Sequence, residues 1–312
     1  MKNMLSAVIL LLLAASLITS ASAQKAKSKD DSIKEISTLS NSQKPEDMEK
    51  AYQISKDFLV RFGSDKDKDG NIAKVRDFVT RYRENAFFKA ADAKRSADAF
   101  AIGKEILAEQ PNNFAVLMSL AYAGYAGSTS PEGKAYMDDA ITYARKASQL
   151  LEAGPEPKSY SPFKDKNEAT SYMYFIDGSL SLSKEPKAAA ESLYKATQIE
   201  ASVKNSSLVY YLIASYYEDL YGKLSADLKA KSKTLNDADY KAESDKADKV
   251  IEAMLDAYAR AVRHAETENS PNKEAWKDRL TQVFTFKNKS AAALPEFINY
   301  ANTMPMPDPA KY

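Results

Sequence analysis

The sequence of 312 residues contains no cysteine and only one histidine, His264. Without thiols the protein cannot form disulfide bonds, and it has neither a cysteine nucleophile nor a thiolate ligand for a metal ion. A single histidine excludes metal sites built on a pair of histidines, and any catalytic triad would depend on it alone. The sequence also lacks a phosphate-binding Gly-Lys-Ser/Thr loop and a dinucleotide fingerprint. We therefore expect no bound metal, no cofactor and no enzymatic activity.

Glycine is also scarce, with nine residues in the whole chain. This is too few for a β-protein rich in turns, and no Asn-Gly or Asp-Gly pair stands between alternating apolar runs. The pair Asp69-Gly70 lies in a charged stretch instead. Apolar residues recur at helical spacing over most of the chain. The sequence therefore predicts an all-α protein.

The chain has no excess of charge of one sign. It carries 44 lysines and arginines against 43 aspartates and glutamates, a formal net charge of +1. A balanced chain produces no long-range field that would attract nucleic acid or an anionic membrane surface. We expect no nucleic acid among its partners.

Only one long apolar run occurs, and it lies at the beginning of the sequence. Lys2 supplies a positive charge, residues 4–19 are uncharged and mostly apolar, and residues 21–23 have the small-x-small pattern of a cleavage site. These features predict a signal peptide over residues 1–23, cleaved after Ala23, and a periplasmic or secreted protein. An N-terminal membrane anchor is the alternative, although a membrane span usually needs about 20 apolar residues. No later segment is long and apolar enough, so we expect no stable membrane insertion after cleavage.

Composition divides the rest of the chain into three parts. Residues 24–44 are polar and aperiodic, which predicts a flexible leader or a frayed first helix. Residues 45–303 show helical periodicity and are expected to form one domain. Residues 304–312 are punctuated by proline and are expected to be extended.

Several helix boundaries can be predicted inside the helical domain. Pro45 is a plausible first-turn proline, and Ser130-Pro131 and Ser270-Pro271 combine a cap with a proline. In the second half of the chain we expect a short helix after Ser270-Pro271 and helices over the ranges 168–183, 186–201, 206–222, 246–268 and 291–302.

The helices resemble tetratricopeptide repeats, a family of stacked helix pairs. The second helix of that repeat carries small residues spaced Ala-x-x-x-Phe/Ala-x-x-Ala, and its first helix carries a large-x-x-Leu-Gly/Ala pattern. The resemblance covers about residues 95–305, and 45–95 more weakly. The matching residues are Ala140, Ala144 and Ala147, then Ala189, Leu193 and Ala196, then Leu117, Leu120 and Ala121, then Tyr210, Ile213, Ala214 and Tyr217, and the exit segment 106–113. The resemblance implies antiparallel pairs stacked as a TPR-like α-solenoid.

The sequence departs from the repeat pattern in three places. Gly103 stands where an apolar contact is expected, and Gly124 where an aromatic would be. The stretch 222–245 is rich in lysine and aspartate and interrupts the last clear pair. The repeats are therefore degenerate, and a helical bundle without repeats is the alternative fold.

Tyrosine is abundant, with nineteen residues. A tyrosine-lined surface can stack on an extended peptide or a glycan, whereas most tyrosines in such a chain occupy packing positions. Tyr210 and Tyr217 match packing positions of the repeat. We therefore predict their neighbours Tyr211 and Tyr216 as exposed residues that bind the partner.

Three other motifs favour a structural role. The stretch Asp65–Asp69 followed by Gly70 is typical of the start of an EF-hand calcium loop, but its twelfth position is Arg76 in place of a bidentate glutamate. Ser181 and Ser192 each begin a Ser-x-x-Lys match that lacks the companion motifs of acyl-enzymes. His264 has no nucleophile nearby in the sequence and is expected to be a surface or capping residue, and Trp276 a packing residue.

The sequence favours a non-enzymatic scaffold that holds a protein or peptide partner in a concave helical groove. A periplasmic protein that binds a small ligand or a glycan is the alternative, and a hydrolase using carboxylates alone is a third hypothesis. The family resemblance implies interaction but does not name the partner.

Overall fold

The structure is a computed structural model that describes residues 27–42, 44–157 and 159–312. Every regular element within these ranges is helical, and no strand occurs among them. The all-α class predicted from periodicity and scarce glycine is therefore confirmed. The predicted signal peptide, residues 1–23, lies outside the described residues.

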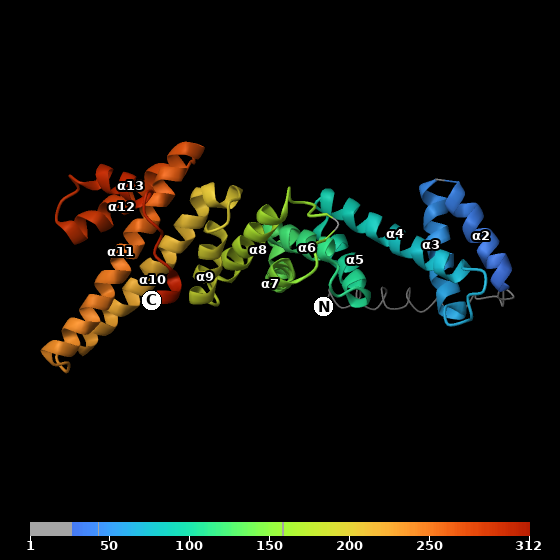
Figure 1. Ribbon diagram of the computed structural model, residues 1–312, viewed down its shortest axis with the longest axis horizontal. Helices are drawn as coiled ribbons and strands as arrows, with labels where there is room; N and C mark the ends of the chain where they lie inside the picture. Colours follow the sequence, from blue (N-terminus) through green and yellow to red (C-terminus); the bar gives the residue numbers. More distant parts are fainter. Residues whose placement is uncertain (1–26, 43, 158) are drawn as a thin grey trace, which may run out of the picture. The chain divides into compact units, whose positions relative to one another are not determined.

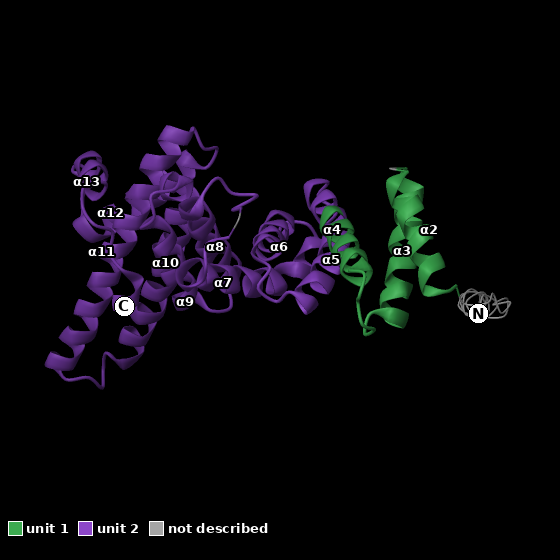
Figure 2. Ribbon diagram, turned by 45° about the vertical axis from the view of Figure 1, so that its right-hand side comes forward, with its two compact units in different colours: residues 1–85 green, residues 86–312 purple. Residues whose placement is uncertain are grey.

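The chain divides into two compact units, Met1–Asn85 and Ala86–Tyr312 (Figures 1 and 2). The boundary falls within helix α4 (Asn71–Asp92) and inside the range 45–303 that sequence periodicity treats as one domain. Helical periodicity continues across residues 85 and 86, so the sequence pattern does not indicate where the two units divide.

The first unit contains α2 (Lys29–Asn41), α3 (Pro45–Phe62) and the beginning of α4. The sequence predicts either a flexible leader or a frayed first helix over residues 24–44. A helix is present there, because α2 forms and packs against α3. The side chain of Ser28 accepts a hydrogen bond from the Asp31 amide and caps this helix. Pro45 occupies the first turn of α3, as predicted. Phe58 is fully buried in the core of this unit.

The second unit is a succession of helices in which each one from α5 to α11 packs against the next in the sequence. Helix α13 packs against α11. The elements are α5 (Ser96–Glu109), α6 (Phe114–Gly127), the 3-10 helix η1 (Gly133–Tyr136), α7 (Met137–Ala153), α8 (Lys166–Ser181), α9 (Pro186–Thr197), η2 (Ser202–Asn205), α10 (Ser207–Lys231), α11 (Asp237–Glu268), α12 (Lys273–Asn288), α13 (Leu294–Ala301) and η3 (Pro309–Lys311).

Small side chains lie at the contacts between neighbouring helices. Small residues allow helix axes to approach within about 8–10 Å, and larger neighbours then fill the grooves. The residues that match the second helix of the repeat pattern are all fully buried: Ala140, Ala144 and Ala147 in α7, and Ala189, Leu193 and Ala196 in α9. The spacing of small residues in the sequence thus marks the side on which α7 and α9 pack against their neighbours.

The two glycines that depart from the repeat pattern mark close approaches. A Cβ atom on Gly124 would lie 2.5 Å from the Cβ of Ala140 in α7 and 3.2 Å from Cζ of Phe100 in α5. A Cβ atom on Gly103 would lie 2.8 Å from Cδ1 of Leu120. An aromatic side chain cannot occupy position 124, because the ring of Phe100 already fills the space beside it.

Most of the charged stretch over residues 222–245 is helical, so the interruption is shorter than predicted and covers residues 232–236. Helix α10 continues to Lys231 and α11 begins at Asp237. Gly222 is exposed and a Cβ there would meet nothing within 4 Å, so it costs helix stability without ending the helix. Asn236 caps α11 by accepting a 2.9 Å hydrogen bond from the Asp239 amide.

Both Ser-Pro pairs precede their helices by more residues than predicted. The hydroxyl of Ser130 accepts from the Gly133 amide at 3.0 Å and forms a turn before η1, so α7 begins only at Met137. The second pair is followed by Asn272 as the cap residue, and α12 begins at Lys273. A serine followed by proline therefore marks the nearest turn of the chain, and the α-helix itself can begin several residues later.

Candidate functional site

The structure does not place both predicted tyrosines at the surface. Tyr216 is only 5 % exposed and its ring lies 5.3 Å from that of Tyr217, so the prediction of an exposed side chain is wrong. Tyr211 is half-buried and stacks on Trp276, with ring centroids 4.6 Å apart. The physical reason is that α10 packs against α9 on one side and α11 on another. Trp276 is 8 % exposed, which confirms its packing role.

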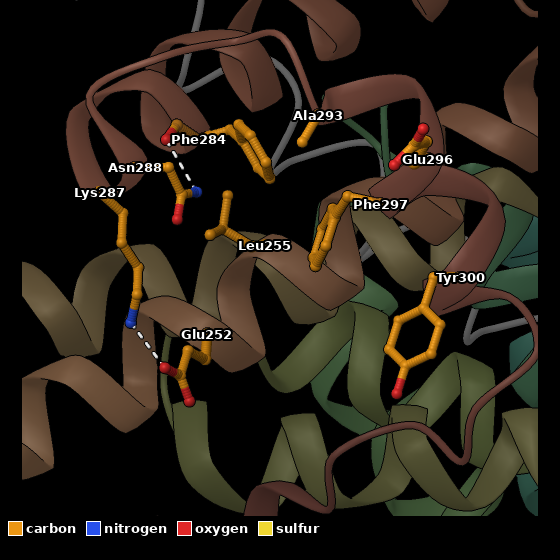
Figure 3. Close-up of a pocket in the computed structure, with 9 residues that line it drawn as sticks. All are labelled: Glu252, Leu255, Phe284, Lys287, Asn288, Ala293, Glu296, Phe297 and Tyr300. Atoms are coloured by element: carbon orange, nitrogen blue, oxygen red, sulfur yellow. Dashed lines mark hydrogen bonds and ion pairs between the residues drawn. The ribbon is translucent and has the colours of Figure 1, made fainter.

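A groove lies where α12 and α13 both pack against α11 (Figure 3). We call it the α11–α13 groove. Its volume is about 720 Å³. The lining residues are Glu252, Leu255, Phe284, Lys287, Asn288, Ala293, Glu296, Phe297 and Tyr300.

The middle of the α11–α13 groove is apolar. Leu255 is 3 % exposed and Phe284 5 % exposed, and the rings of Phe284 and Phe297 lie 5.3 Å apart. In Figure 3 these side chains lie between Lys287 at one end and Tyr300 at the other. Tyr300 is 60 % exposed, so a large aromatic surface stays open to solvent beside an apolar floor.

Polar groups lie around the apolar middle of the groove. Lys287 donates from Nζ to Oε1 of Glu252 at 2.7 Å and to the backbone carbonyl of Asp248 at 3.3 Å. The Asn288 side chain donates to the Phe284 carbonyl at 3.1 Å. Glu296 stands at the exposed edge. Lys287 is thus paired with Glu252 of α11 at one end of the apolar middle of the groove.

No motif of the sequence marks the exposed aromatic residues of this region. Phe286 is 59 % exposed and lies two residues after the buried Phe284. Residues two apart on a helix do not face the same side. The spacing of Phe284 and Phe286 therefore indicates, from the sequence alone, that only one of the two rings can lie in the core. Tyr300 lies three residues after Phe297, which places both on one face of α13.

The acidic loop of the first unit is used to cap a helix. The carboxylate of Asp67 accepts from the amides of Ile72 at 3.0 Å and Ala73 at 2.9 Å, at the start of α4. These backbone hydrogen bonds lower the pKa of Asp67. Asp65 pairs with Lys29, and Arg76 donates to the Gly63 carbonyl at 3.2 Å. A search of the described part of the chain finds no group of three His, Cys, Asp or Glu residues suited to a metal ion.

The two Ser-x-x-Lys matches do not bring serine and lysine together. Ser181 donates to the backbone carbonyl of Asp177 at 2.6 Å, and Ser192 donates to the Asp177 carboxylate at 2.7 Å. Lys184 pairs with Asp138, and Lys195 lies over the ring of Tyr174. Ser181 therefore bonds within α8, and Ser192 joins α9 to α8.

His264 lies against Tyr210 and is half-buried, so it is not a fully exposed surface residue, and its ring forms a hydrogen bond with the backbone of Asn205 at the end of η2. The two rings are parallel within 7° and 5.0 Å apart. Burial lowers the pKa of His264 below its ordinary value, and the nearby Arg260 and Arg263 act in the same direction, while Glu268 opposes them. The imidazole is therefore neutral in the folded protein near neutral pH.

We expect His264 to make stability depend on pH. Because the pKa of His264 is lower in the folded than in the unfolded state, the folded state binds fewer protons. The contribution of His264 to the free energy of unfolding is therefore complete above the ordinary pKa of about 6.5, and it is lost as pH falls through the folded pKa. His264 is the single histidine, so its imidazole signal in NMR can be titrated directly. The variant His264→Gln should lose this part of the pH dependence. A measured pKa at or above the ordinary value would contradict the assignment.

Over the described ranges, none of the helices is both long and apolar enough for a membrane span. Comparisons of the chain with protein-family models, curated proteins and solved structures find no match.

Proposed function

We propose that this chain is a non-enzymatic binding scaffold whose α11–α13 groove holds an apolar side chain of a protein or peptide partner. One observation carries the proposal: an apolar floor of Leu255 and Phe284 lies beside Tyr300, a residue that is 60 % exposed. Burial of apolar surface drives most protein association, and the few residues that contribute most binding energy are enriched in tyrosine and lie in pockets that lose water on binding.

Two further elements of the proposal come from the sequence. The buried small residues of α7 and α9 support a TPR-like array of helix pairs, because their spacing matches that family and they lie at helix contacts. The apolar run and the small-x-small site of residues 1–23 support export to the periplasm or secretion. An exported helical array without disulfides would act through a preformed surface.

The variant Tyr300→Ala should weaken partner binding by about tenfold, which corresponds to about 1.4 kcal/mol for one exposed aromatic anchor. A photo-crosslinking amino acid at position 297 would first capture the partner in the host. The affinity of the purified partner would then be measured for the wild type and for the variant. Tyr300 is exposed, so the helical circular-dichroism spectrum should not change.

Tyr240→Ala is the matched control, because Tyr240 is 42 % exposed on α11 and does not line the groove. Its affinity should equal that of the wild type. Equal loss in both variants, or no loss in Tyr300→Ala, would remove the groove as the binding site. If the crosslink captures no protein, while a glycan or metabolite stabilises the wild type in a saturable way and Tyr300→Ala does not respond, the small-ligand alternative replaces the proposal.

A further inference from the structure

The last nine residues of the sequence, 304–312, lie along helices of the second unit, and we call them the 304–312 segment. Residues 304–308 are not helical, and the short helix η3 follows. Proline occupies positions 305, 307 and 309. Proline has no backbone N–H, so such a segment offers mainly carbonyl oxygens for recognition. Proline-rich segments favour an extended helix with three residues per turn.

The side chains that this segment buries recur every third residue. Met306 is 7 % exposed, Pro309 is buried, and Tyr312 is half-buried with its ring 5.4 Å from that of Tyr217. Met304, Pro305, Ala310 and Lys311 are exposed, whereas Pro307 and Asp308 are half-buried. The segment therefore contacts the protein over residues 306–309 and again at Tyr312.

The carbonyl groups that accept side-chain hydrogen bonds also recur every third residue. Arg260 donates to the carbonyl of Met304 at 2.6 Å, and Tyr217 donates to that of Pro307 at 3.3 Å. The carbonyl of Ala310 lies 3.5 Å from the ammonium group of its donor, Lys187 of α9. Donors from three different helices thus reach the backbone of the segment at every third residue.

Tyrosine side chains line the groove under the segment. Tyr217 of α10 lies against Tyr312, Tyr210 of α10 lines a cavity beside the segment, and η3 packs against α9 (Figure 1). The segment does not fill the groove, because a cavity of about 220 Å³ remains beside it. That cavity is lined by Thr197, Gln198, Lys204, Tyr210, Arg260, Asn302, Met304, Pro305 and Met306.

We propose that the groove of α9, α10 and α11 is a binding site for proline-rich extended segments, and that residues 304–312 occupy it as an internal ligand. Aromatic-lined grooves with donors for carbonyl groups are the general way in which proteins recognise such segments. A tethered ligand competes at an effective concentration of about millimolar order, so the groove opens to a partner segment only when residues 304–312 leave it. This site is separate from the α11–α13 groove, and its failure would leave the function proposed for that groove untouched.

The test uses the full chain and a fluorescent synthetic peptide with the sequence of residues 303–312. One variant carries Met306→Ser together with Tyr312→Ser, which removes two inward side chains and releases the internal segment. Its matched control carries Met304→Ser together with Lys311→Ser, which changes two outward positions. Fluorescence anisotropy should show saturable binding by the first variant, at least about tenfold tighter than by the wild type or the control.

Changes in the peptide test the register without altering the protein. A peptide with serine in place of the residues equivalent to Met306, Pro309 and Tyr312 should lose binding to the released variant. A peptide with serine at the positions of Met304 and Lys311 should keep it. Absence of binding by the released variant, or equal binding of both altered peptides, would overturn the proposal.

A second measurement does not depend on the released variant. The wild type is incubated with the unaltered peptide at millimolar concentration, and hydrogen exchange is followed at the amides of residues 306–312. Displacement of the internal segment should accelerate exchange there, and the peptide with serine at the three inward positions should not. Unchanged exchange with the unaltered peptide would overturn the proposal even if the released variant fails to fold.

Discussion

Replacing Arg260 with methionine should lower the free energy of unfolding by about 3–5 kcal/mol, the usual cost of removing one partner from a buried ion pair. Arg260 is 8 % exposed and donates from Nε to the Asp256 carboxylate at 2.7 Å. Its Nη2 also donates to the carbonyls of Ala301 and Met304. The substitution would leave a buried carboxylate and two carbonyl groups without this donor.

The loss should be largest near neutral pH. Burial raises the pKa of Asp256, and the hydrogen bond and charge of Arg260 oppose this rise. Because the pKa of Asp256 is higher in the folded state, its contribution to the free energy of unfolding is fully present below the unfolded pKa. This contribution is lost as pH rises through the folded pKa. Without Arg260 the pKa of Asp256 rises further, so protonation at acidic pH removes part of the penalty.

Urea unfolding followed by tryptophan fluorescence measures this effect, because Trp276 is the single tryptophan and lies in α12 of the same unit. Arg279→Met is the matched control. Arg279 pairs with Glu218, and the two side chains are 43 % and 33 % exposed, so its loss should cost at most about 1 kcal/mol. Equal losses for the two variants would show that the Arg260 network contributes no more than a surface ion pair.

Replacing Gly124 with valine should destabilise the second unit by about 3 kcal/mol, the upper part of the range for overpacking a close-packed contact. The Cβ atom alone would lie 2.5 Å from the Cβ of Ala140, and that atom cannot move without its helix. A side chain rotation gives no relief, so α6 and α7 must separate. The same separation would loosen the buried alanines of α7.

Gly222→Val provides the comparison, because a Cβ at Gly222 meets nothing within 4 Å in the exposed part of α10. Glycine and valine are both poor helix formers, so we expect a change within about 0.5 kcal/mol. Thermal unfolding followed by far-UV circular dichroism measures both variants. A midpoint for Gly124→Val equal to that of Gly222→Val would contradict the close approach of α6 and α7.

Local patterns predicted the helices well where the signal lies within one turn or one face. Pro45 opens α3, and the alanine spacing of α7 and α9 marks the buried side of each helix. Helix ends were less accurate at residues 222–245, because lysine, alanine and leucine favour the helix there while the glycine opposes it only weakly. The interruption is for this reason shorter than predicted, and covers residues 232–236.

The candidate site was harder to predict than the helices. Tyr216 is buried because α10 packs against both α9 and α11, whereas the repeat pattern marks only Tyr210 and Tyr217 among these tyrosines as packing positions. The α11–α13 groove draws residues from three helices whose sequence positions span 252–300. Nothing in a local pattern states that α12 and α13 both pack on α11.

By itself the sequence determined that the protein is helical, that it lacks thiol chemistry, and which small residues lie at helix contacts. These properties depend on composition and on the spacing of neighbours within a helix, which a single segment contains. Only the tertiary structure decided which aromatic residues remain exposed, that Asp67 caps a helix, and that residues 304–312 lie against helices of the second unit. Those properties depend on which distant helices meet, and the free energy of such contacts comes from surfaces that no single segment carries.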